Sequence, residues 1–600
     1  MRRRPLITGL PALAALGATA SRAAALASAD GKTLHLAFPS PETSFDPPQT
    51  NSDSNSSTVI AQILEAPLAY DYLARPVRLL PNTAAAMPEV SADGRSFTVR
   101  LKSGIFFADD PAFGGKPREL VAADHVYALK RFYDPRYNSS DLYLFESLKP
   151  PGLSELRERA VKTRKPFDYD AEVEGVRALD RYTLRVRLGV TDPRFVWLLA
   201  DPVYMGAVAR EVVERYGDEI GAHPVGTGAF RLRSWRRGSR IELERSPGFR
   251  RVEYEGTPAA EPVAKAIALQ LKGQLLPRAE RVVIDIVEET QPRWLSFLDG
   301  TYHWLTVPGT FRNLAAPGGR IAPYLAKRGV QLQTHAQPDM QMNFFFMEHP
   351  LVGGYTPEKV ALRRAIALGF DSDAYVQHVF GGFGVRAQST IPPFTSGYDA
   401  AYKSEMSEYS PAKARALLDL YGYVDRDGDG WREQPDGKPL VLSMAGTSSQ
   451  VERRGHELWK RGMDAIGLKI EFDISTWPEL LKKSRAGTLM MWGYAWGAGS
   501  PDGGFFLGIA YGPNASESND PRFMLPAFDR LFERQRALPD GPEREAVMRE
   551  AKNLLVAYMP FKVHLHNVLP VLVQPWTQGY WRHPFMRDIY RFVSTGPRPV

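Results

Sequence analysis

The feature that most constrains the fold is a run of alternating strand and helix patterns in the last third of the chain. Short apolar segments typical of buried strands are separated by segments whose apolar residues recur three and four positions apart, as in amphipathic helices. In order, they are a strand at 440–444, a helix at 450–466, a strand at 468–474, a helix at 478–486 and a strand at 488–498. Strands and helices that alternate over short turns predict an α/β sheet.

The same alternation is found near the start of the chain. Residues 34–38 predict a strand, and residues 58–70 predict a helix with Thr58 as its N-cap. A chain of 600 residues exceeds what a single core holds, so we expect two or three domains. There is no internal repeat and no low-complexity linker, which favours domains that are wound through one another.

The first 29 residues have the pattern of an export signal. Three arginines at positions 2–4 precede an apolar segment at 6–20, and Ala27-Ser28-Ala29 is a small-x-small cleavage site. The arginines also fit a twin-arginine signal, so Sec and twin-arginine export both stay open. Cleavage removes four arginines and no acidic residue, which lowers the formal net charge from +7 to +3. A charge this small gives no reason to expect nucleic acid as a partner.

The chain has no cysteine. Disulfides, thiolate nucleophiles, cysteine-ligated zinc and a lipid anchor on an N-terminal cysteine are therefore all excluded. The segment at 6–20 is too short to span a bilayer well. An exported, freely diffusing protein needs an enclosed compartment, so we expect the mature protein in a Gram-negative periplasm.

Residues 488–507 combine an aromatic strand with a glycine-rich loop. Trp492, Tyr494 and Trp496 are two residues apart and therefore share one face of the strand. Glycines at 497, 499, 503 and 504 allow another backbone to approach closely. A packed core strand explains this pattern, and so does a wall against which an extended ligand lies.

Three segments in order resemble the extracellular solute-binding proteins of family 5, the oligopeptide- and dipeptide-binding group of ABC importers. Residues 92–107 resemble the family's signature hairpin, and residues 224–230 resemble the return of the chain into the first lobe. Residues 360–371, together with Asn343, resemble the first helix of the second lobe. Each segment is weakly specific alone, but their order and spacing fit the family over nearly the whole mature chain.

The resemblance implies a two-lobed α/β periplasmic binding protein with an extra domain inserted in lobe one and a hinge between the lobes. Lobe one would comprise 30–76, 226–306 and 563–600, the extra domain 77–225, and lobe two 307–562. The resemblance also implies a function: the substrate-binding component of an ABC importer, which encloses a peptide or peptide-like polar solute by hinge closure. Its partners would be an inner-membrane permease and ATPase complex, and it would work as a monomer without a cofactor.

The resemblance also indicates where the ligand binds. In peptide-binding relatives the strand that matches 489–498 pairs with the peptide main chain, and the loop after the first strand faces the cleft. We therefore expect the ligand-binding residues to be Phe45, Asp46, Asn51, Tyr494, Trp496, Gly497, Gly499, Ser500, Asp502 and Phe505.

Gly499 departs from the family pattern. Peptide binders commonly end this strand in Trp-x-Ala-Asp, and the carboxylate holds the free α-amino group of the peptide. Here Trp496 is followed by glycine, alanine and then Gly499, so no carboxylate stands at that position. A buried ammonium without a partner is costly. A blocked peptide or an unrelated polar metabolite therefore becomes credible, and Asp502 is the alternative anchor for an amine.

Other polar motifs have structural explanations. Asp425, Asp427 and Asp429 fit the spacing of a calcium loop, but the flanking segments predict a helix and a strand rather than two helices, so we expect a plain turn and no metal. His564 and His566 lie on one face of a strand at the expected hinge and are interpreted as structural histidines.

The sequence does not favour an enzyme. Ser410 and Lys413 have the Ser-x-x-Lys spacing of an acyl-enzyme, but Ser410 also fits the N-cap of a helix that begins with a proline. Gly-x-Ser-x-Gly and His-Glu-x-x-His motifs are absent. The alternatives that stay open are an exported two-domain hydrolase and a chaperone-like or signalling receptor on the same fold.

Overall fold

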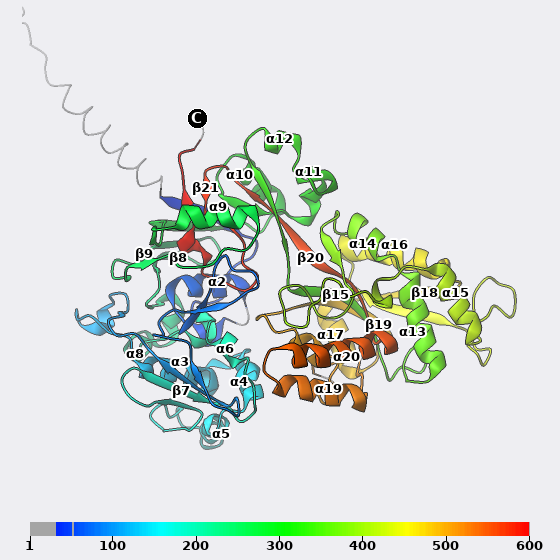
Figure 1. Ribbon diagram of the computed structural model, residues 1–600, viewed down its shortest axis with the longest axis horizontal. Coiled ribbons are helices and arrows are strands. Elements are labelled where there is room, and N and C mark those ends of the chain that lie inside the picture. The colour runs from blue at the N-terminus through cyan, green and yellow to red at the C-terminus, as the bar shows by residue number, and fades with distance from the viewer. Residues whose placement is uncertain (1–31, 51–52, 516, 599–600) are drawn as a thin grey trace, which may run out of the picture.

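The computed structural model describes residues 32–50, 53–515 and 517–598. The expected signal peptide and the candidate ligand residue Asn51 lie outside the described residues. Within them, two α/β lobes lie side by side, and the long strand β20 runs from one to the other (Figure 1). No helix of the described part is both long and apolar enough to cross a membrane.

The first lobe contains a four-stranded sheet in the order β1-β12-β9-β8. β1 is parallel to β12, and the remaining pairs are antiparallel. Alternate residues of a strand face the same side, so Leu34 and Leu36 of β1 are both buried in the core. The elements of this lobe include β1 (Thr33–Phe38), β8 (Phe230–Arg236), β9 (Arg240–Arg245), β12 (Arg281–Ile286), α2 (Ser54–Ile63), α9 (Pro262–Leu271) and α10 (Thr290–Leu298).

Helix α2 differs from the predicted helix at 58–70. It begins at Ser54 because the carboxylate of Asp53 accepts hydrogen bonds from the N–H groups of Asn55 and Ser56, both at 3.0 Å. The cap is therefore Asp53 and not Thr58. The predicted end was also wrong, since α2 stops at Ile63 and the strand β2 (Leu68–Tyr70) follows.

A second sheet belongs to the segment where the extra domain was expected. Its strand order is β4-β5-β7-β6, entirely antiparallel. Phe97 and Val99 point inward and are fully buried, as the strict alternation of β5 requires. The core of this sheet is continuous with that of the first lobe. Its elements include β4 (Glu89–Val90), β5 (Ser96–Arg100), β6 (Val176–Ala178), β7 (Thr183–Arg187), α3 (Ala122–Tyr133), α4 (Leu142–Leu148), α5 (Leu153–Thr163), α6 (Phe195–Leu198), α7 (Pro202–Met205) and α8 (Arg210–Tyr216).

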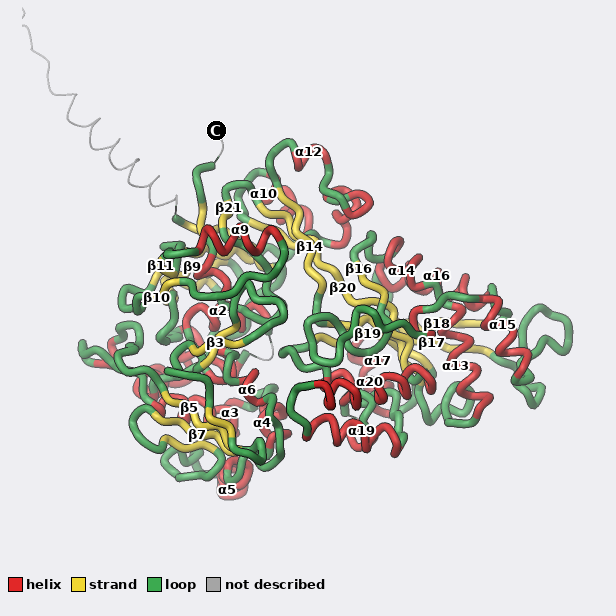
Figure 2. The backbone as a smooth tube through the Cα atoms, viewed as in Figure 1, coloured by secondary structure: helices red, strands yellow, loops and turns green. Residues whose placement is uncertain are grey.

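The second lobe is built around the strands predicted in the last third of the chain. The sheet continues from β20 in the order β15-β19-β17-β18, with helices on its faces (Figure 2). β17 and β18 are parallel, as expected for strands joined by a helix. Its elements include β15 (Asp339–Phe345), β17 (Val441–Gly446), β18 (Lys469–Ile474), β19 (Met491–Gly497), α13 (Pro357–Gly369), α14 (Ser372–His378), α15 (Pro411–Leu420), α16 (Gln450–Asp464), α17 (Trp477–Ala486), α18 (Gly504–Gly508), α19 (Pro526–Ala537) and α20 (Pro542–Tyr558).

Strand β20 (Phe561–Val573) belongs to both lobes. Its first half pairs with β15 and β16 (Gly384–Arg386), and its second half pairs with β13 (Trp304–Thr306) and β14 (Gln331–Ala336). The lobes are thus connected by β20 and by the two-residue link between β14 and β15. The predicted domain boundaries stay a prediction, and the boundary at 562–563 falls inside this shared strand.

Candidate functional site

Most of strand β19 has a pairing partner on one side only. It is antiparallel to β15 from Met491 to Gly497. On its other side β17 meets it at one position, Met444 opposite Met491. From Trp492 onward, this second edge of β19 has no strand partner in the described part of the chain. We refer to residues 492–497 on this side as the open edge.

The register shows which main-chain groups face the open edge. The N–H of Ala498 donates to the carbonyl of Pro338 at 2.8 Å, so even-numbered residues of this strand direct their hydrogen-bonding groups toward β15. In an antiparallel pair these directions alternate along the strand. The N–H and C=O groups of Gly493, Ala495 and Gly497 therefore face the open edge. All three residues are small, which allows another chain to approach.

Aromatic side chains cover one face of the same strand. Trp492 is buried, whereas Tyr494 and Trp496 are half-buried and their ring centroids are 6.0 Å apart. The Tyr494 hydroxyl bonds to the carboxylate of Asp520, and burial together with that carboxylate raises the pKa of the phenol. The ring of Trp496 is 5.5 Å from that of Phe505, which is 42% exposed. Trp496 and Phe505 thus form an aromatic corner that solvent reaches.

The loop after β19 is open around Gly499. A Cβ atom placed on Gly499 would have no heavy atom within 4 Å, and one on Gly497 would meet only the Cβ of Asp339 at 4.0 Å. Gly499 is exposed and Ser500 is half-buried. The position at which the family resemblance implies a carboxylate therefore has room for one in this protein.

Asp502 is held by protein cations from two parts of the molecule. Its carboxylate is 2.5 Å from the guanidinium of Arg544 in lobe two and 3.4 Å from that of Arg194 in the extra domain. Ser396 also donates to it at 3.1 Å. Burial alone would raise the pKa of Asp502, but the charges of Arg544 and Arg194 hold it below its usual value. This carboxylate is therefore engaged in a contact between the lobes.

Phe45 and Asp46 are also engaged within the protein. The carboxylate of Asp46 forms a bidentate ion pair with Arg131, at 2.5 and 2.8 Å, and both side chains are only 1% exposed. The ring of Phe45 is buried 4.5 Å from that of Trp235. Asp46 thus connects the first strand's loop to helix α3 of the extra domain. A role for either residue in ligand contact stays a prediction.

The acidic turn forms a compact cluster. Carboxylate oxygens of Asp425, Asp427, Asp429 and Glu433 lie within 4.8 Å of one another. The carboxylate of Asp425 accepts the N–H groups of Gly428 and Gly430, at 2.7 and 3.0 Å, which fixes the turn through protein groups alone.

The histidine and serine motifs have structural partners. His564 Nε2 is 2.7 Å from the amide oxygen of Asn343, and His566 Nδ1 is 2.7 Å from the carbonyl of Asp339. Burial lowers the pKa of His566 to about 4. Ser410 accepts the N–H of Lys413 at 3.3 Å and caps α15, so the Ser-x-x-Lys spacing is that of a helix start.

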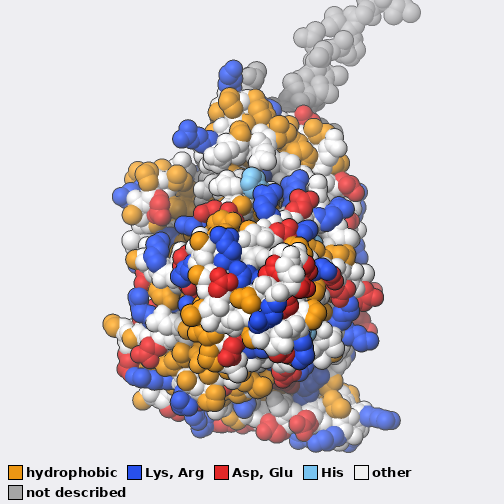
Figure 3. All heavy atoms as spheres, turned by 90° about the vertical axis from the view of Figure 1, so that its right-hand side faces the viewer, with side chains coloured by type: hydrophobic (Ala, Val, Ile, Leu, Met, Phe, Trp, Pro, Cys, Tyr) orange, Lys and Arg blue, Asp and Glu red, His pale blue; other side chains and the backbone are white. Residues whose placement is uncertain are grey.

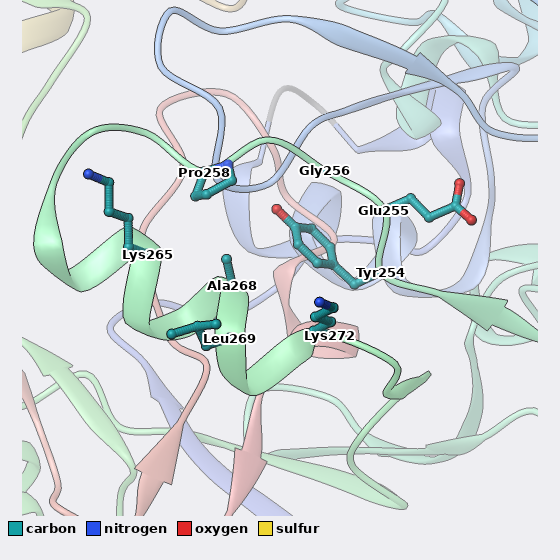
Figure 4. Close-up of a pocket in the computed structure, with 8 residues that line it drawn as sticks. All are labelled: Tyr254, Glu255, Gly256, Pro258, Lys265, Ala268, Leu269 and Lys272. Carbon is teal, nitrogen blue, oxygen red and sulfur yellow. The ribbon is translucent and has the colours of Figure 1, made fainter.

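Two surface features lie apart from β19. A pocket of about 480 Å³ lies between α9 and residues 254–258, and Figure 4 shows Lys265, Ala268 and Leu269 of the helix on the opposite side of it from the ring of Tyr254. It is lined by first-lobe residues and contains none of the predicted ligand residues. On the face of lobe two seen in Figure 3, Lys and Arg side chains are intermixed with Asp and Glu. That face therefore presents no field of a single sign.

Some site features were not predicted from the sequence. Gly493 and Ala495 were absent from the expected ligand residues, although glycine in a strand is a known signal for a close backbone approach. Arg194 was also missed. Its contact with Asp502 joins residues far apart in the chain, and no local pattern indicates such a pair.

Comparison with known proteins gives relatives along almost the entire chain. The Di/tripeptide-binding protein 2 of Pseudomonas aeruginosa (strain UCBPP-PA14) is 25% identical over 586 residues, which cover 95% of this chain and 96% of that protein. The Heme-binding protein A of Haemophilus influenzae is 24% identical and covers 84% of this chain and 82% of its own. The solved structure of the ABC transporter-associated periplasmic binding protein DppA from Helicobacter pylori, in complex with the peptide STSA, superposes with a TM-score of 0.65. It is 19% identical and covers 94% of this chain and 98% of its own.

These comparisons agree with the geometry described above. The solved structure confirms the two-lobed α/β fold expected from the sequence. The model of the middle region of the bacterial extracellular solute-binding proteins, family 5, matches residues 78–518. This match spans the extra domain, most of lobe two and strand β19. The chain therefore belongs to the bacterial extracellular solute-binding proteins of family 5.

Proposed function

We propose that this protein is the periplasmic receptor of an ABC importer and that it binds a peptide or peptide-like solute along the open edge of β19. In this proposal the solute adds a strand to the sheet, so that its main chain bonds to Gly493, Ala495 and Gly497. Main-chain bonds supply affinity without regard to sequence, and side chains of the solute occupy the spaces on either side.

The open edge is the observation that carries this proposal. An exposed strand edge with unpaired N–H and C=O groups is a template for pairing with another chain, and proteins usually cover or shorten such edges. Here the edge is bordered by the aromatic rings of Trp496 and Phe505, which suit apolar groups of a solute.

Closure of the lobes is the proposed way in which the solute is held. A solute that contacts both lobes stabilises the arrangement in which they are close, and the connections through β20 and the β14–β15 link allow one lobe to rotate against the other. No bond in the solute is made or broken in this cycle. The protein then presents the solute to a permease and ATPase complex in the inner membrane.

The relatives support the solute class. One is named for di- and tripeptides, and another is shown with a bound peptide. A third is named for heme, so solutes other than peptides are also bound by relatives. Because Gly499 provides no carboxylate to pair with an amine, the proposal includes solutes that lack a free amine.

The substitution Ala495→Pro tests the open edge directly. Proline has no N–H, and the N–H of Ala495 faces the open edge rather than β15, so the sheet should keep its own hydrogen bonds. We expect calorimetry with an N-acetylated tripeptide to show at least tenfold weaker binding, because one main-chain bond is lost and the proline ring blocks the edge. The control Ala495→Ser keeps the N–H and should bind normally.

The contrary result is equally clear. If Ala495→Pro remains folded by circular dichroism and binds as tightly as the unmodified protein, the solute does not pair with β19. If the unmodified protein binds no tripeptide and releases no solute on denaturation, the assignment as a solute receptor for this class fails.

A further inference from the structure

The segment that connects β13 to β14 contains basic residues and no acidic ones. β13 and β14 pair with the same residues of β20 from opposite sides, so residues 307–330 have to cross the sheet. This segment includes the short helices α11 (Arg312–Ala315) and α12 (Pro323–Ala326). From Gly300 to Pro338 the chain contains no aspartate or glutamate. The charged residues of the segment are Arg312, Arg320, Lys327 and Arg328.

The inner face of the segment covers a small hydrophobic core of lobe one. Ala315 and Leu325 are fully buried there, in one cluster with Phe297 of α10 and Leu572 of β20. The apolar contacts that hold the segment on the sheet are therefore made on this side. The outer face has no need of apolar residues for the fold.

The outer face nevertheless carries apolar side chains. Leu314 is 53% exposed and Tyr324 is 40% exposed. The two are neighbours, because the Tyr324 hydroxyl donates to the carbonyl of Leu314 at 3.4 Å. Burial raises the pKa of the Tyr324 phenol and the positive charge of Arg328 counteracts this rise, so a cation lies beside the pair. Apolar side chains that gather on a surface, rimmed by polar ones, mark a site of interaction.

The cations of the outer face have no acidic partner. Arg320, Lys327 and Arg328 are all exposed, and none of them forms an ion pair with any residue that the structure describes. Arg328 donates to the main-chain carbonyl of Leu298 instead. By contrast, exposed arginines of the lobe-one sheet are paired with carboxylates, as in Arg240 with Asp285 at 2.7 Å. The outer face of residues 307–330 thus presents positive charge that the protein does not neutralise.

We propose that this outer face docks on the anionic phospholipid surface of a membrane. Unpaired lysines and arginines are attracted to acidic headgroups, and leucine and tyrosine side chains enter the interface between headgroups and acyl chains. The match is one of charge and apolarity rather than of shape, which favours a bilayer over a protein partner. Figure 1 shows α11 and α12 at the opposite end of the molecule from α5, so the extra domain does not obstruct a flat surface at this end.

This docking surface goes beyond the proposed function. Residues 307–330 contain none of the residues of the open edge, so docking does not depend on which solute is bound at β19. Its consequence is that the receptor stays near a membrane instead of diffusing freely through its compartment.

The test uses the full mature protein and vesicles of defined lipids. Co-sedimentation compares vesicles of equimolar phosphatidylglycerol and phosphatidylcholine with vesicles of phosphatidylcholine alone. We expect about tenfold or more tighter binding to the anionic vesicles at low ionic strength, because the three cations are attracted to acidic headgroups. Added salt should reduce this preference, because it screens exposed charges.

Two double variants test the charges. Arg320→Gln combined with Lys327→Gln should weaken binding to the anionic vesicles about twentyfold, since each cation near such a surface contributes roughly fivefold. The matched control is Lys116→Gln combined with Lys165→Gln, which removes two exposed cations from the extra domain. We expect this control to bind like the unmodified protein.

Two single variants test the apolar contribution. Leu314→Ser should weaken binding about fivefold, because roughly half of this side chain is still available for burial. Leu420→Ser is the control, since Leu420 is 76% exposed on α15 of lobe two, and it should leave binding unchanged. All four side-chain positions of the outer face and its controls that are changed to neutral or polar groups are exposed or paired with no acid, so circular dichroism should show the native fold.

The contrary outcomes are distinct from those of the proposed function. If the unmodified protein does not bind the anionic vesicles, or if the outer-face variants bind as tightly as their controls, the docking surface is overturned. Ultracentrifugation without vesicles tests a second copy as the partner: a dimer that Leu314→Ser disrupts and Leu420→Ser keeps also overturns it. Calorimetry with an N-acetylated tripeptide should give one affinity for all these variants, so the docking surface can fail while the proposed function stands, and the reverse.

Discussion

The side chain of Arg194 connects the extra domain directly to lobe two, without a solute between them. Arg194 is the N-cap residue of α6 in the extra domain, and its side chain is 7% exposed. It donates to the carbonyl of Leu538 at 3.1 Å and to the carbonyl of Arg536, both just beyond α19 or at its end. Its Nε is also 3.4 Å from the carboxylate of Asp502. We predict that this contact holds the extra domain and lobe two close together.

The expected effect of Arg194→Ala follows from these bonds. A hydrogen bond to a charged donor contributes about 1.5–3 kcal/mol, so two of them contribute roughly 3–6 kcal/mol to the arrangement with the lobes in contact. Asp502 keeps Arg544 at 2.5 Å and Ser396 at 3.1 Å. Asp192, which is 3.4 Å from the Arg194 guanidinium, loses that ion pair but still accepts the main-chain N–H of residue 194 at 3.0 Å. Each 1.4 kcal/mol is a factor of ten, so the population of this arrangement should fall by about two orders of magnitude or more.

Spin labels on α8 and α19, whose separation is measured by pulsed electron resonance, provide the assay. In solution without solute, Arg194→Ala should shift the distance distribution to longer values, and saturating solute should restore the shorter ones with a weaker apparent affinity. Arg210→Ala is the control, because Arg210 lies in the same domain and pairs with Asp170 and Glu214 of that domain. A distance distribution that Arg194→Ala leaves unchanged would refute the reasoning.

Three further predictions concern β19 and the shared strand. Trp496→Ala should weaken binding of an N-acetylated tripeptide about tenfold by calorimetry, since an aromatic wall supplies roughly 1–3 kcal/mol; a variant that unfolds instead would show that the ring is a core residue. Gly499→Asp should raise the affinity for tripeptides with a free amine, because the position has room for the carboxylate, and unchanged affinity would count against an amine at this end. Burial lowers the pKa of Lys562 from 10.5 to about 7, so the unfolded chain binds the additional proton between these values and the free energy of unfolding rises with pH. Measured by chemical denaturation, the free energy of unfolding of the unmodified protein should rise between pH 7 and 9 by about 2 kcal/mol more than that of Lys562→Met. The same pH dependence in both proteins would contradict the lowered pKa of Lys562.

Local patterns predicted the architecture well. The strands expected at 468–474 and 488–498 are present as β18 and β19. They could be predicted because the buried faces of a strand determine which of its positions are apolar, and this pattern is visible in the sequence. The α/β class and the family are confirmed by the comparisons. The helix at 58–70 was misplaced because a capping carboxylate five residues earlier, Asp53, offered a better start than Thr58.

Contacts between residues that are far apart in the chain could not be predicted from the sequence. The ion pair between Asp46 and Arg131 could not be predicted, because the two residues are 85 positions apart and no spacing rule links them. Likewise, Asp502 could be identified as a candidate from its loop, whereas its neutralisation by Arg544 and Arg194 depends on how two lobes meet. The predicted ligand residues stay predictions until a solute is bound.

Strand β20 also constrains the order in which the protein can fold. The segment Phe561–Val573 pairs with β13 and β14 at one end and with β15 and β16 at the other, and it follows all four strands in the chain. Until that segment has been synthesised, β15 in one lobe and β14 in the other each lack a neighbour and expose unpaired edges. We therefore expect a nascent or truncated chain that ends before residue 561 to be prone to aggregation and dependent on chaperones.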